Sequence, residues 1–512
     1  MFDAVSWLVF LTFFAIFVFI GFAAVVWRRG NLGHINEWAL AGRRLGTWLM
    51  FFLVGADLYT AYTFIAIPSS VFAKGAIFFY AVPYVTLTFG IAMLAMPRIW
   101  SISHKKGYLT ASDFIRDRHQ SRSLGVIVAL TGIVALLPYI ALQIVGMQAV
   151  LTAMFSQTST GLAPSSLSDI ALLIAFVILA AFTYVSGLRG ATLTAVLKDA
   201  IVFITVIAVT VVVATAGDFS KAFTAKAAFA TLPTKFENAY LSLFVMSALA
   251  LYLYPHAING VQSATGVKPL RRSTALLPLY GIGLAGLALF GVIVYALPSA
   301  LAYVHTFPTS TQGTQVVPGV ILFTLPDWLA GLAFLGIFIG GLVPAAIMAM
   351  SQATLLARNV IGEATKLKPE TELRIAKYGS ILFKFLALGF VFVVPATYAV
   401  QLQLFGGVLI LQILPSLFFG LFRYRLGKYS LIAGLVVGVS YGLYLMEYAN
   451  NFTSWTTTLY VASQPFGYLY IGLTALLTNI VIVVVGSLIE NRLVHRAPTP
   501  AATAPPSSPS QD

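Results

Sequence analysis

Five ionisable residues lie within long apolar stretches of the sequence, where an unpaired charge is costly. Carboxylate, amine and imidazole groups in such surroundings can bind an ion or exchange a proton, and they pair with one another or with backbone carbonyls. Lys384 is the exception, because its long side chain is expected to reach a polar neighbour or a headgroup and to have a structural role. The five are Asp57, Lys198, Asp199, His256 and Lys384.

Two of these residues coincide with expected breaks in apolar helices. Residues 55–60 (GADLYT) place a flexible glycine and Asp57 at the middle of one stretch. Residues 252–256 (YLYPH) place a proline before His256 in another, and proline removes a helix hydrogen bond and clashes with the preceding turn. Broken helices expose N–H and C=O groups that can bind a solute and an ion. The alternative is that the proline is a tolerated kink and the glycine a packing contact.

Side chains around the two expected breaks are the candidate substrate-binding residues. No arginine lies at the middle of an apolar stretch. Capture of a small anion would therefore depend on hydroxyls and on the N-termini of the half-helices, whose exposed N–H groups carry positive potential. For His256, the alternative to a binding role is hydrogen-bonded scaffolding. The candidates are Asp57, Tyr59, Thr60, Thr63, Gln143, Tyr254, His256 and Asn259.

The composition determines the surroundings of these residues. Of the 512 residues 59% are hydrophobic and 9% are charged, and the mean hydropathy is +0.92. A soluble domain carries roughly 25% charged residues, and a disordered chain is less hydrophobic and more charged, so both classes are excluded. The six histidines are scattered and no HExxH pair is present, which argues against an intramembrane enzyme. We expect a polytopic membrane protein without cysteine chemistry or a cofactor.

Thirteen transmembrane helices are predicted, each from a stretch that can cross a bilayer of about 30 Å. The first stretch is longer than the core of a signal peptide and is followed by its arginines, so we expect a retained helix. The predicted spans are 5–26, 47–71, 78–99, 124–155, 169–185, 193–214, 241–261, 276–300, 328–356, 373–394, 404–421, 431–446 and 468–489.

The basic residues predict the orientation of these spans. Three basic residues at the ends of spans, Arg98, Arg374 and Lys377, are counted with the loops that they adjoin. Twenty-four of the 30 Lys and Arg then fall in alternate loops, four fall in the opposite loops, and two lie deep within spans. Cytoplasmic loops carry the excess of basic residues, so we expect a multi-pass plasma (inner) membrane protein with its N-terminus outside and its C-terminus in the cytoplasm. The same loops explain the net charge of +14 without a nucleic-acid partner.

The two expected breaks lie five helices apart, which suggests an internal repeat. Spans two to six and seven to eleven would form two halves, inverted relative to each other because each has an odd number of helices. The expected divisions are an extra helix at 1–30, repeats at 45–215 and 236–422, two helices at 428–490, and a disordered tail at 497–512 rich in Pro, Ala, Ser and Thr.

Several segments, in order from about residue 36 to 430, resemble motifs of the sodium:solute symporter family. Two of them look most like the monocarboxylate-permease branch of that family. The family motifs are an entry motif at 36–46, a cytoplasmic segment at 107–114 and a turn before the fifth core helix at 183–189; the branch motifs are 55–64 and 138–143.

The resemblance implies an all-α polytopic membrane protein with a LeuT-type 5+5 inverted-repeat core, in which sodium is held between core helices one and eight. The carbonyls of Gly55 and Leu58 would bind the ion together with side chains of residues 344–351. Sodium-using relatives carry adjacent Ser or Thr hydroxyls where this chain has Ala349 and Met350, which offer a hard cation no oxygen. The candidate ion-coupling residues are Gly55, Asp57, Leu58, Lys198, Asp199, Ala346, Ala349 and Ser351.

Lys198 offers an alternative to sodium. A buried lysine can lose its proton near neutral pH, and its ammonium could occupy the space of a sodium ion, with Asp57 as a counter-charge. Proton coupling or sodium-independent transport is then the hypothesis. The alternative is that Lys198 reaches the cytoplasmic headgroups and pairs with Asp199.

The function that the resemblance implies is secondary active symport of a small organic solute by alternating access, coupled to a gradient of Na⁺ or H⁺. The branch favours a short monocarboxylate of the lactate, pyruvate and acetate class. An amino acid, a sugar, or a transporter-like sensor without net transport are the alternatives. The expected partners are a small-molecule substrate and the lipid bilayer, with no nucleic acid and no obligate protein partner.

Overall fold

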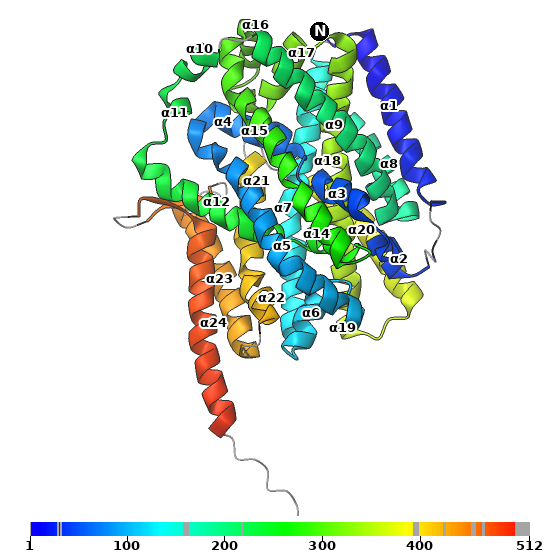
Figure 1. The fold of residues 1–512 in the computed structure, drawn as a ribbon, viewed down its shortest axis with the longest axis vertical. Coiled ribbons are helices and arrows are strands. Elements are labelled where there is room, and N and C mark those ends of the chain that lie inside the picture. The colour runs from blue at the N-terminus through cyan, green and yellow to red at the C-terminus, as the bar shows by residue number, and fades with distance from the viewer. Residues whose placement is uncertain are drawn as a thin grey trace, which may run out of the picture.

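The computed structural model describes residues 2–27, 30, 33–156, 163–216, 219–392, 399–422, 426–451, 457–462 and 466–496. In these ranges the chain is largely helical, and long helices run side by side between an upper and a lower end (Figure 1). The N-terminus lies at the upper end and α24 points downward from the bundle (Figure 1). The predicted disordered tail at 497–512 lies outside the described residues.

Long apolar helices form the body of the molecule, since in a bilayer every backbone polar group must be satisfied within its own segment. They are α1 (Ala4–Ala23), α5 (Ala81–Lys106), α7 (Arg122–Phe155), α8 (Pro164–Ser186), α9 (Leu188–Ala216), α12 (Glu237–Leu251), α15 (Pro278–Ile293), α18 (Asp327–Leu355), α20 (Pro369–Val391), α21 (Ala399–Ile410), α23 (Lys428–Ala449) and α24 (Ile471–Arg496).

Shorter elements connect these helices or complete them. The short helices are α2 (Ile35–Leu40), α3 (Thr47–Ala56), α4 (Ile67–Lys74), α6 (Ala111–Arg118), α10 (Phe219–Thr224), α11 (Ala227–Ala230), α13 (Pro255–Gln262), α14 (Val267–Leu276), α16 (Pro298–His305), α17 (Val316–Thr324), α19 (Gly362–Ala364) and α22 (Leu414–Leu417). Two short strands, β1 (Leu459–Val461) and β2 (Tyr468–Tyr470), pair antiparallel.

Eleven helices among the described residues are long and apolar enough to cross a membrane, so the predicted number of thirteen is not confirmed. The second and third predicted spans fall on the short helix α3 and on one helical stretch, Tyr62–Lys106. The predicted span 373–394 falls largely on α20, which carries Arg374, Lys377 and Lys384 and is too charged to be counted by apolarity alone.

Helix α18 is the axis of the bundle. It packs against α1, α7, α9 and α20, and each of its residues from Leu329 to Leu355 is buried. Small residues permit this close packing. A Cβ on Gly331 would lie 2.4 Å from the carbonyl oxygen of Ser6 in α1, so the two backbones touch at this point.

Two helices are interrupted at the middle of the bundle, at the predicted positions. The first stops with α3 at Ala56 and resumes through a π-helical turn at Tyr62–Ala66 into α4. The second stops with α12 at Leu251, and after residues 252–254 it resumes as α13 with Pro255 in its first turn, where proline has no N–H bond to lose.

The lower halves of the two interrupted helices are joined by backbone hydrogen bonds. Leu45, just before α3, donates its N–H to the carbonyl of Ser263 at 3.1 Å and accepts from the N–H of Thr265 at 3.0 Å. Leu45 and Ala264 therefore form an isolated parallel bridge. The bridge fixes where α3 begins relative to the end of α13.

Candidate functional site

The break after α3 is held open by side chains that replace the missing helix hydrogen bonds. The backbone N–H of Ala61 donates to Oε1 of Gln143 on α7 at 3.1 Å, and that of Tyr62 donates to the hydroxyl of Thr60 at 3.1 Å. The hydroxyl of Thr63 donates to the carbonyl of Leu58. Three of the residues predicted to bind substrate thus satisfy backbone groups in the break.

Asp57 and His256 meet across the two breaks. Nε2 of His256, in the first turn of α13, lies 3.2 Å from Oδ2 of Asp57. The two residues are 1% and 8% exposed, so the pair is shut off from bulk water in this conformation. The rings of Tyr139 on α7 and Tyr254 lie 5.7 and 5.6 Å from the imidazole.

Lys198 points to the same break from α9. Its ammonium donates to the carbonyl oxygens of Ala56 at 2.7 Å and Tyr59 at 2.8 Å, and it lies 3.2 Å from Oδ1 of Asp199. Both side chains are fully buried. The lysine pairs with Asp199 as the alternative interpretation expected, but it does not reach the headgroups, because its stem is directed at the open end of α3.

The helical period explains how neighbouring residues on α9 serve two different elements. Lys198 and Asp199 are consecutive and point about 100° apart around the helix, since α-helices turn once per 3.6 residues. Lys198 faces α3, while Asp199 accepts a 2.6 Å hydrogen bond from the hydroxyl of Tyr280 on α15. A Cβ on Gly55 would lie 2.0 Å from the Tyr280 ring, so a glycine is needed where this tyrosine passes α3.

The predicted ion ligands lie in two groups. The carbonyl of Gly55 accepts from the N–H groups of Leu58 and Tyr59, and the carbonyl of Leu58 accepts from Thr63, so neither is directed at Lys198. The carbonyls that bind the ammonium are the next ones along, those of Ala56 and Tyr59. Each carbonyl that binds the ammonium is thus one residue later in the sequence than the predicted one, because the chain turns after α3.

On α18 the predicted ligands do not meet Lys198 through oxygen. Ala346 and Ala349 are buried and end in methyl groups. The hydroxyl of Ser351 accepts from the amide of Asn259 at 3.0 Å and donates to the carbonyl of Ile347 at 2.9 Å. Asn259, predicted as a substrate residue, therefore ties α13 to α18.

Sequence reasoning missed two tyrosines of the site. Tyr280 donates a hydrogen bond to Asp199, which in turn pairs with Lys198. The ring of Tyr280 lies 4.6 Å from that of Tyr59. Tyr139 packs on His256 and on Tyr254, whose hydroxyl donates to the carbonyl of Gln403 at 3.3 Å. A hydroxyl deep within an apolar span was the available signal, but aromatic residues of membrane proteins are more often interfacial anchors.

At the lower end of the bundle a network of hydrogen bonds surrounds Asp113, the fully buried N3 residue of α6. Its carboxylate accepts from Nε of Arg358 at 2.7 Å, the amide of Asn359 at 2.8 Å and the backbone N–H of Leu109 at 2.9 Å. Arg358 also lies 3.2 Å from Glu372 of α20. These bonds tie α6 to the segment that follows α18.

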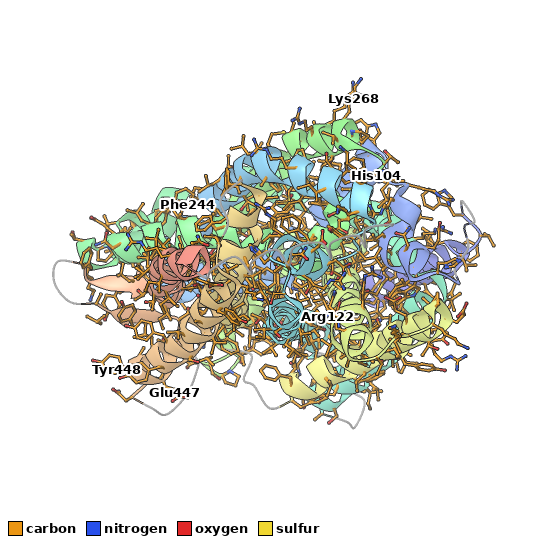
Figure 2. All side chains as sticks on the ribbon, turned by 90° about the horizontal axis from the view of Figure 1, so that it is seen from below. His104, Arg122, Phe244, Lys268, Glu447 and Tyr448 are labelled. Atoms are coloured by element: carbon orange, nitrogen blue, oxygen red, sulfur yellow. The ribbon has the colours of Figure 1, made fainter. Side chains whose placement is uncertain are left out.

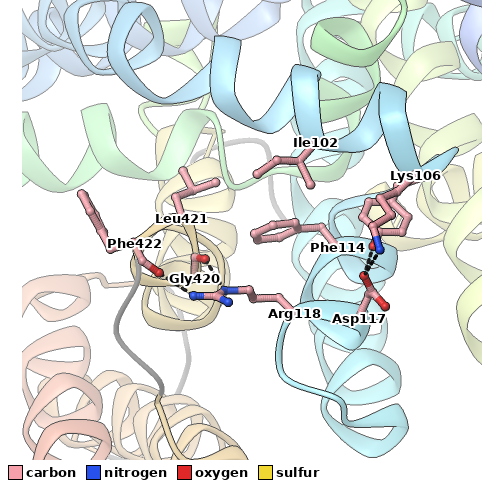
Figure 3. A pocket seen from close by; sticks show the side chains of 9 residues that line it. Ile102, Lys106, Phe114, Asp117, Arg118, Gly420, Leu421 and Phe422 are labelled. Atoms are coloured by element: carbon pink, nitrogen blue, oxygen red, sulfur yellow. Dashed lines mark hydrogen bonds and ion pairs between the residues drawn. The ribbon is translucent and has the colours of Figure 1, made fainter.

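A second set of contacts at this end surrounds a cavity of about 510 Å³ between α5, α6 and residues 420–422 (Figure 3). Arg118 donates to the carbonyls of Gly420 at 2.7 Å and Phe422 at 2.5 Å. Asp117 lies 3.6 Å from Lys106 and accepts from the hydroxyl of Tyr108, which lowers the pKa of Asp117. These contacts join α6, from the first half of the chain, to residues 420–422, from the second half.

Two interrupted helices with buried ionisable side chains at the breaks are typical of a secondary transporter. Residues 38–438 match the model of the sodium:solute symporter family, and the chain belongs to that family. The protein is thus a secondary symporter of a small solute. Among the described residues no three His, Asp or Glu side chains gather as a metal site.

Relatives support this assignment. The chain is 37% identical over 506 residues to a protein of Rhizobium johnstonii named "Monocarboxylate transport permease protein", covering 96% of this chain and 98% of the relative. It is 31% identical over 436 residues to an uncharacterized symporter of Bacillus subtilis, covering 81% and 83%.

A solved structure shows the same fold. It is the substrate-bound, outward-open state of a Na⁺-coupled sialic acid symporter, with a TM-score of 0.73 and 15% identity, covering 96% of this chain and 98% of that chain. The prediction of an all-α polytopic membrane protein with a LeuT-type core is confirmed.

Proposed function

We propose that the protein is a proton-driven, sodium-independent symporter of short monocarboxylates of the lactate, pyruvate and acetate class. The observation that carries this proposal is the Lys198 ammonium between the carbonyls of Ala56 and Tyr59. The solute class is supported by the relative named for monocarboxylate transport. Sodium, which the names of the family and of the solved neighbour contain, is the alternative coupling ion.

The lysine leaves little for a sodium ion to bind at this position. A hard cation needs several oxygen ligands, and two carbonyls and a carboxylate are already engaged with the ammonium. The side chains of Ala346 and Ala349 on α18 carry no oxygen that could bind the ion. A fixed positive charge in this place performs the structural part of a bound ion, because it joins α9 to the end of α3.

An anionic solute can be captured at the breaks without an arginine. Helix α13 begins at the second break, and its first N–H groups and dipole favour a negative charge there. His256 and the hydroxyls of Tyr254 and Tyr139 surround this point. The buried site must open alternately to the two sides, as rocking of one bundle of helices against the other allows.

We further propose that the lower end of the bundle faces the cytoplasm of a plasma (inner) membrane, with the N-terminus outside. Seen from below, Arg122 at the start of α7 lies over the middle of the bundle and Lys268 of α14 lies at its edge (Figure 2). Arg43, Arg118 and Arg358 also take part in contacts at this end. Such a concentration of basic residues is typical of the cytoplasmic side.

Uptake of labelled pyruvate into proteoliposomes tests the proposal. An inward proton gradient alone should drive accumulation, and replacing all sodium by choline should leave the rate unchanged. Strict dependence on sodium at a fixed pH gradient would contradict the coupling assignment.

Competition separates the solute classes in the same assay. We expect excess lactate or acetate to inhibit pyruvate uptake, whereas proline and glucose should not. Inhibition by proline or glucose alone would favour the amino-acid or sugar alternative. Binding of pyruvate without accumulation under any gradient would favour a transporter-like sensor.

A further inference from the structure

The Asp57–His256 pair has unused hydrogen-bonding capacity. Oδ1 of Asp57 and both ring nitrogens of His256 are buried and have no hydrogen-bond partner among the described residues. The 3.2 Å contact between Oδ2 and Nε2 is the polar link between the two breaks. A buried ionised carboxylate beside a neutral imidazole would be poorly compensated, whereas one proton held by the pair removes its net charge.

The charges that face this pair leave Asp57 without a full counter-charge. Lys198 of α9 binds the carbonyl of Ala56, next to Asp57 in the chain, but the anion it pairs with is Asp199, which Tyr280 of α15 also binds. From the other sides the pair is faced by the rings of Tyr139 and Tyr254, which lie 5.7 and 5.6 Å from the imidazole. The Lys198–Asp199 pair is neutral as a unit, so the charge state of the site depends on the Asp57–His256 pair.

We propose that the Asp57–His256 pair carries the proton that is transported with the solute, while Lys198 keeps its proton throughout. This inference rests on the proposed function and names the group that performs the coupling. The proton comes from the outer solution, is held by the pair while the carboxylate is bound, and is released with the solute on the inner side.

Electrostatics gives the coupling its direction. A solute carboxylate close to an ionised Asp57 would be repelled strongly, because water does not screen the two charges in a buried site. A protonated pair removes this repulsion and offers a hydrogen-bond donor to the incoming anion. Solute and proton therefore bind together, and loss of either weakens the binding of the other by the same factor.

Proton uptake on binding tests this inference directly. Pyruvate is added to purified protein in weakly buffered, sodium-free detergent solution, and a pH indicator reports protons taken up per solute bound. We expect about one for the wild-type protein and close to none for Asp57→Asn and for His256→Gln. Two variants are used because either one alone could disturb folding, which thermal unfolding would reveal.

Lys384→Gln is the matched control. It removes a fully buried amine that donates to Thr183 and Ser380 and contacts neither break, so proton uptake should persist if the Asp57–His256 pair is the carrier. Loss of uptake in this variant, or full uptake in both Asp57→Asn and His256→Gln, would overturn the inference. Failure of pyruvate to bind without sodium would instead overturn the proposed function, and the same titration in sodium would still show whether the pair takes up the proton.

A different observation concerns the upper end of the molecule. A cavity of about 680 Å³ lies at the outer ends of α4, α16 and α21, and Lys74, Lys226 and His305 line it. The ammonium of Lys226 is held 3.3 Å from the carbonyl of Phe72 and 4.8 Å from the ring centre of Tyr295. None of the described residues that line the cavity is acidic.

The cations of this cavity are unusual for the upper side. Only four lysines and no arginine fall in the loops assigned to it, and two of the four line this one cavity. We propose that it is an entry site for small organic anions. From here α4 leads back to the break at Asp57, and a cleft lined by one sign of charge raises the local concentration of the opposite ion.

Kinetics with single-charge variants test the entry site. Lys74→Gln and Lys226→Gln should each raise KM for pyruvate, by about threefold to tenfold at low salt, with kcat little changed. The increase should shrink at 0.5 M salt, where charges are screened within about 4 Å.

Lys235→Gln is the matched control, since Lys235 is an upper-side lysine that does not line the cavity. Lys226→Arg should behave as the wild type if the charge matters. An equal change of KM in Lys235→Gln, or no change in either cavity variant, would overturn the entry site.

Discussion

Lys198 and Lys384 are both fully buried lysines, but their partners give them different roles. Lys384 donates to two hydroxyls, those of Thr183 at 2.6 Å and Ser380 at 2.9 Å, so it ties α20 to α8 through neutral groups. Lys198 is surrounded by two carbonyls and a carboxylate, the ligand set that suits a hard cation. Of the two lysines, only Lys198 occupies a position where a metal cation could replace its ammonium group.

Removal of the Lys198 side chain should therefore create a sodium site. In Lys198→Ala the carbonyls of Ala56 and Tyr59 and the carboxylate of Asp199 lose their cation, which leaves a buried charge at a cost of about 3–5 kcal/mol. We expect a lower unfolding temperature in choline chloride and a specific recovery in sodium chloride, measured by thermal shift.

Lys384→Ala, which leaves only hydroxyls behind, should lose stability without a preference between the two salts. The absence of any sodium-specific recovery in Lys198→Ala would show that these oxygens do not form an ion site.

At the residue scale the sequence predicted the candidates and the pairing of Lys198 with Asp199, but not the other partners. Scarcity of charge in apolar stretches singled out Asp57, Lys198 and His256. The sequence could not say that Lys198 is directed at α3 instead of the headgroups, because the direction of a side chain matters only relative to a neighbouring helix. The missed Tyr280 lies in an otherwise ordinary apolar helix, and only the position of α15 beside α9 gives its hydroxyl a partner.

At the scale of elements, the interrupted helix after α3 depends on its caps. The turn between Ala56 and Tyr62 leaves backbone N–H groups without helix partners, and Gln143 and Thr60 accept two of them. The broken state is thus stabilised by side chains from within the turn and from α7. A continuous helix would need neither.

Gln143→Ala should weaken the break. A buried donor left without a partner costs about 1–3 kcal/mol, so we expect a lower unfolding temperature and a reduced affinity for the solute. Gln143→Glu keeps the accepting oxygen, and it should retain more of the stability than the alanine variant. Thermal unfolding with and without pyruvate measures both effects, and equal stability of alanine variant and wild type would contradict the capping role.

The positions of the helices were predictable because apolar stretches of about 20 residues have few alternatives in a bilayer. Their number was less so. Helix α20 can contain three cations because Lys384 has hydroxyl partners and because Arg374 and Lys377 lie near the start of the helix. Hydropathy alone reveals neither fact. The divisions at 45–215 and 236–422 remain a prediction.

At the scale of the whole molecule, the Asp113 network connects helices at the lower end, and we expect it to oppose opening there. Arg358 links α6 to α20 through Asp113 and Glu372. Arg358→Gln should shift the protein toward a state that is open at the lower end, and a shift of about 1.4 kcal/mol multiplies the open population tenfold.

The chain contains no cysteine, so labelling of Ser103→Cys, buried near the lower end of α5, reports this opening. Its reaction with a thiol reagent should be faster in the Arg358→Gln background. Arg122→Gln is the control, since that exposed arginine lies 3.9 Å from Glu363 in a weaker pair. Equal rates in all backgrounds would contradict the role of the network.

The parallel bridge at Leu45 constrains how the molecule can move. Because two backbone hydrogen bonds join the start of α3 to the end of α13, we expect these lower half-helices to move together as one rigid unit. The upper halves, α4 and α12, have no such bond to each other among the described residues and can swing separately about the breaks. Asp57 and His256 lie at the two breaks, where the upper and lower half-helices would rotate relative to each other. A change in helix tilt would therefore alter the distance between the two side chains, and with it the affinity of the pair for a proton.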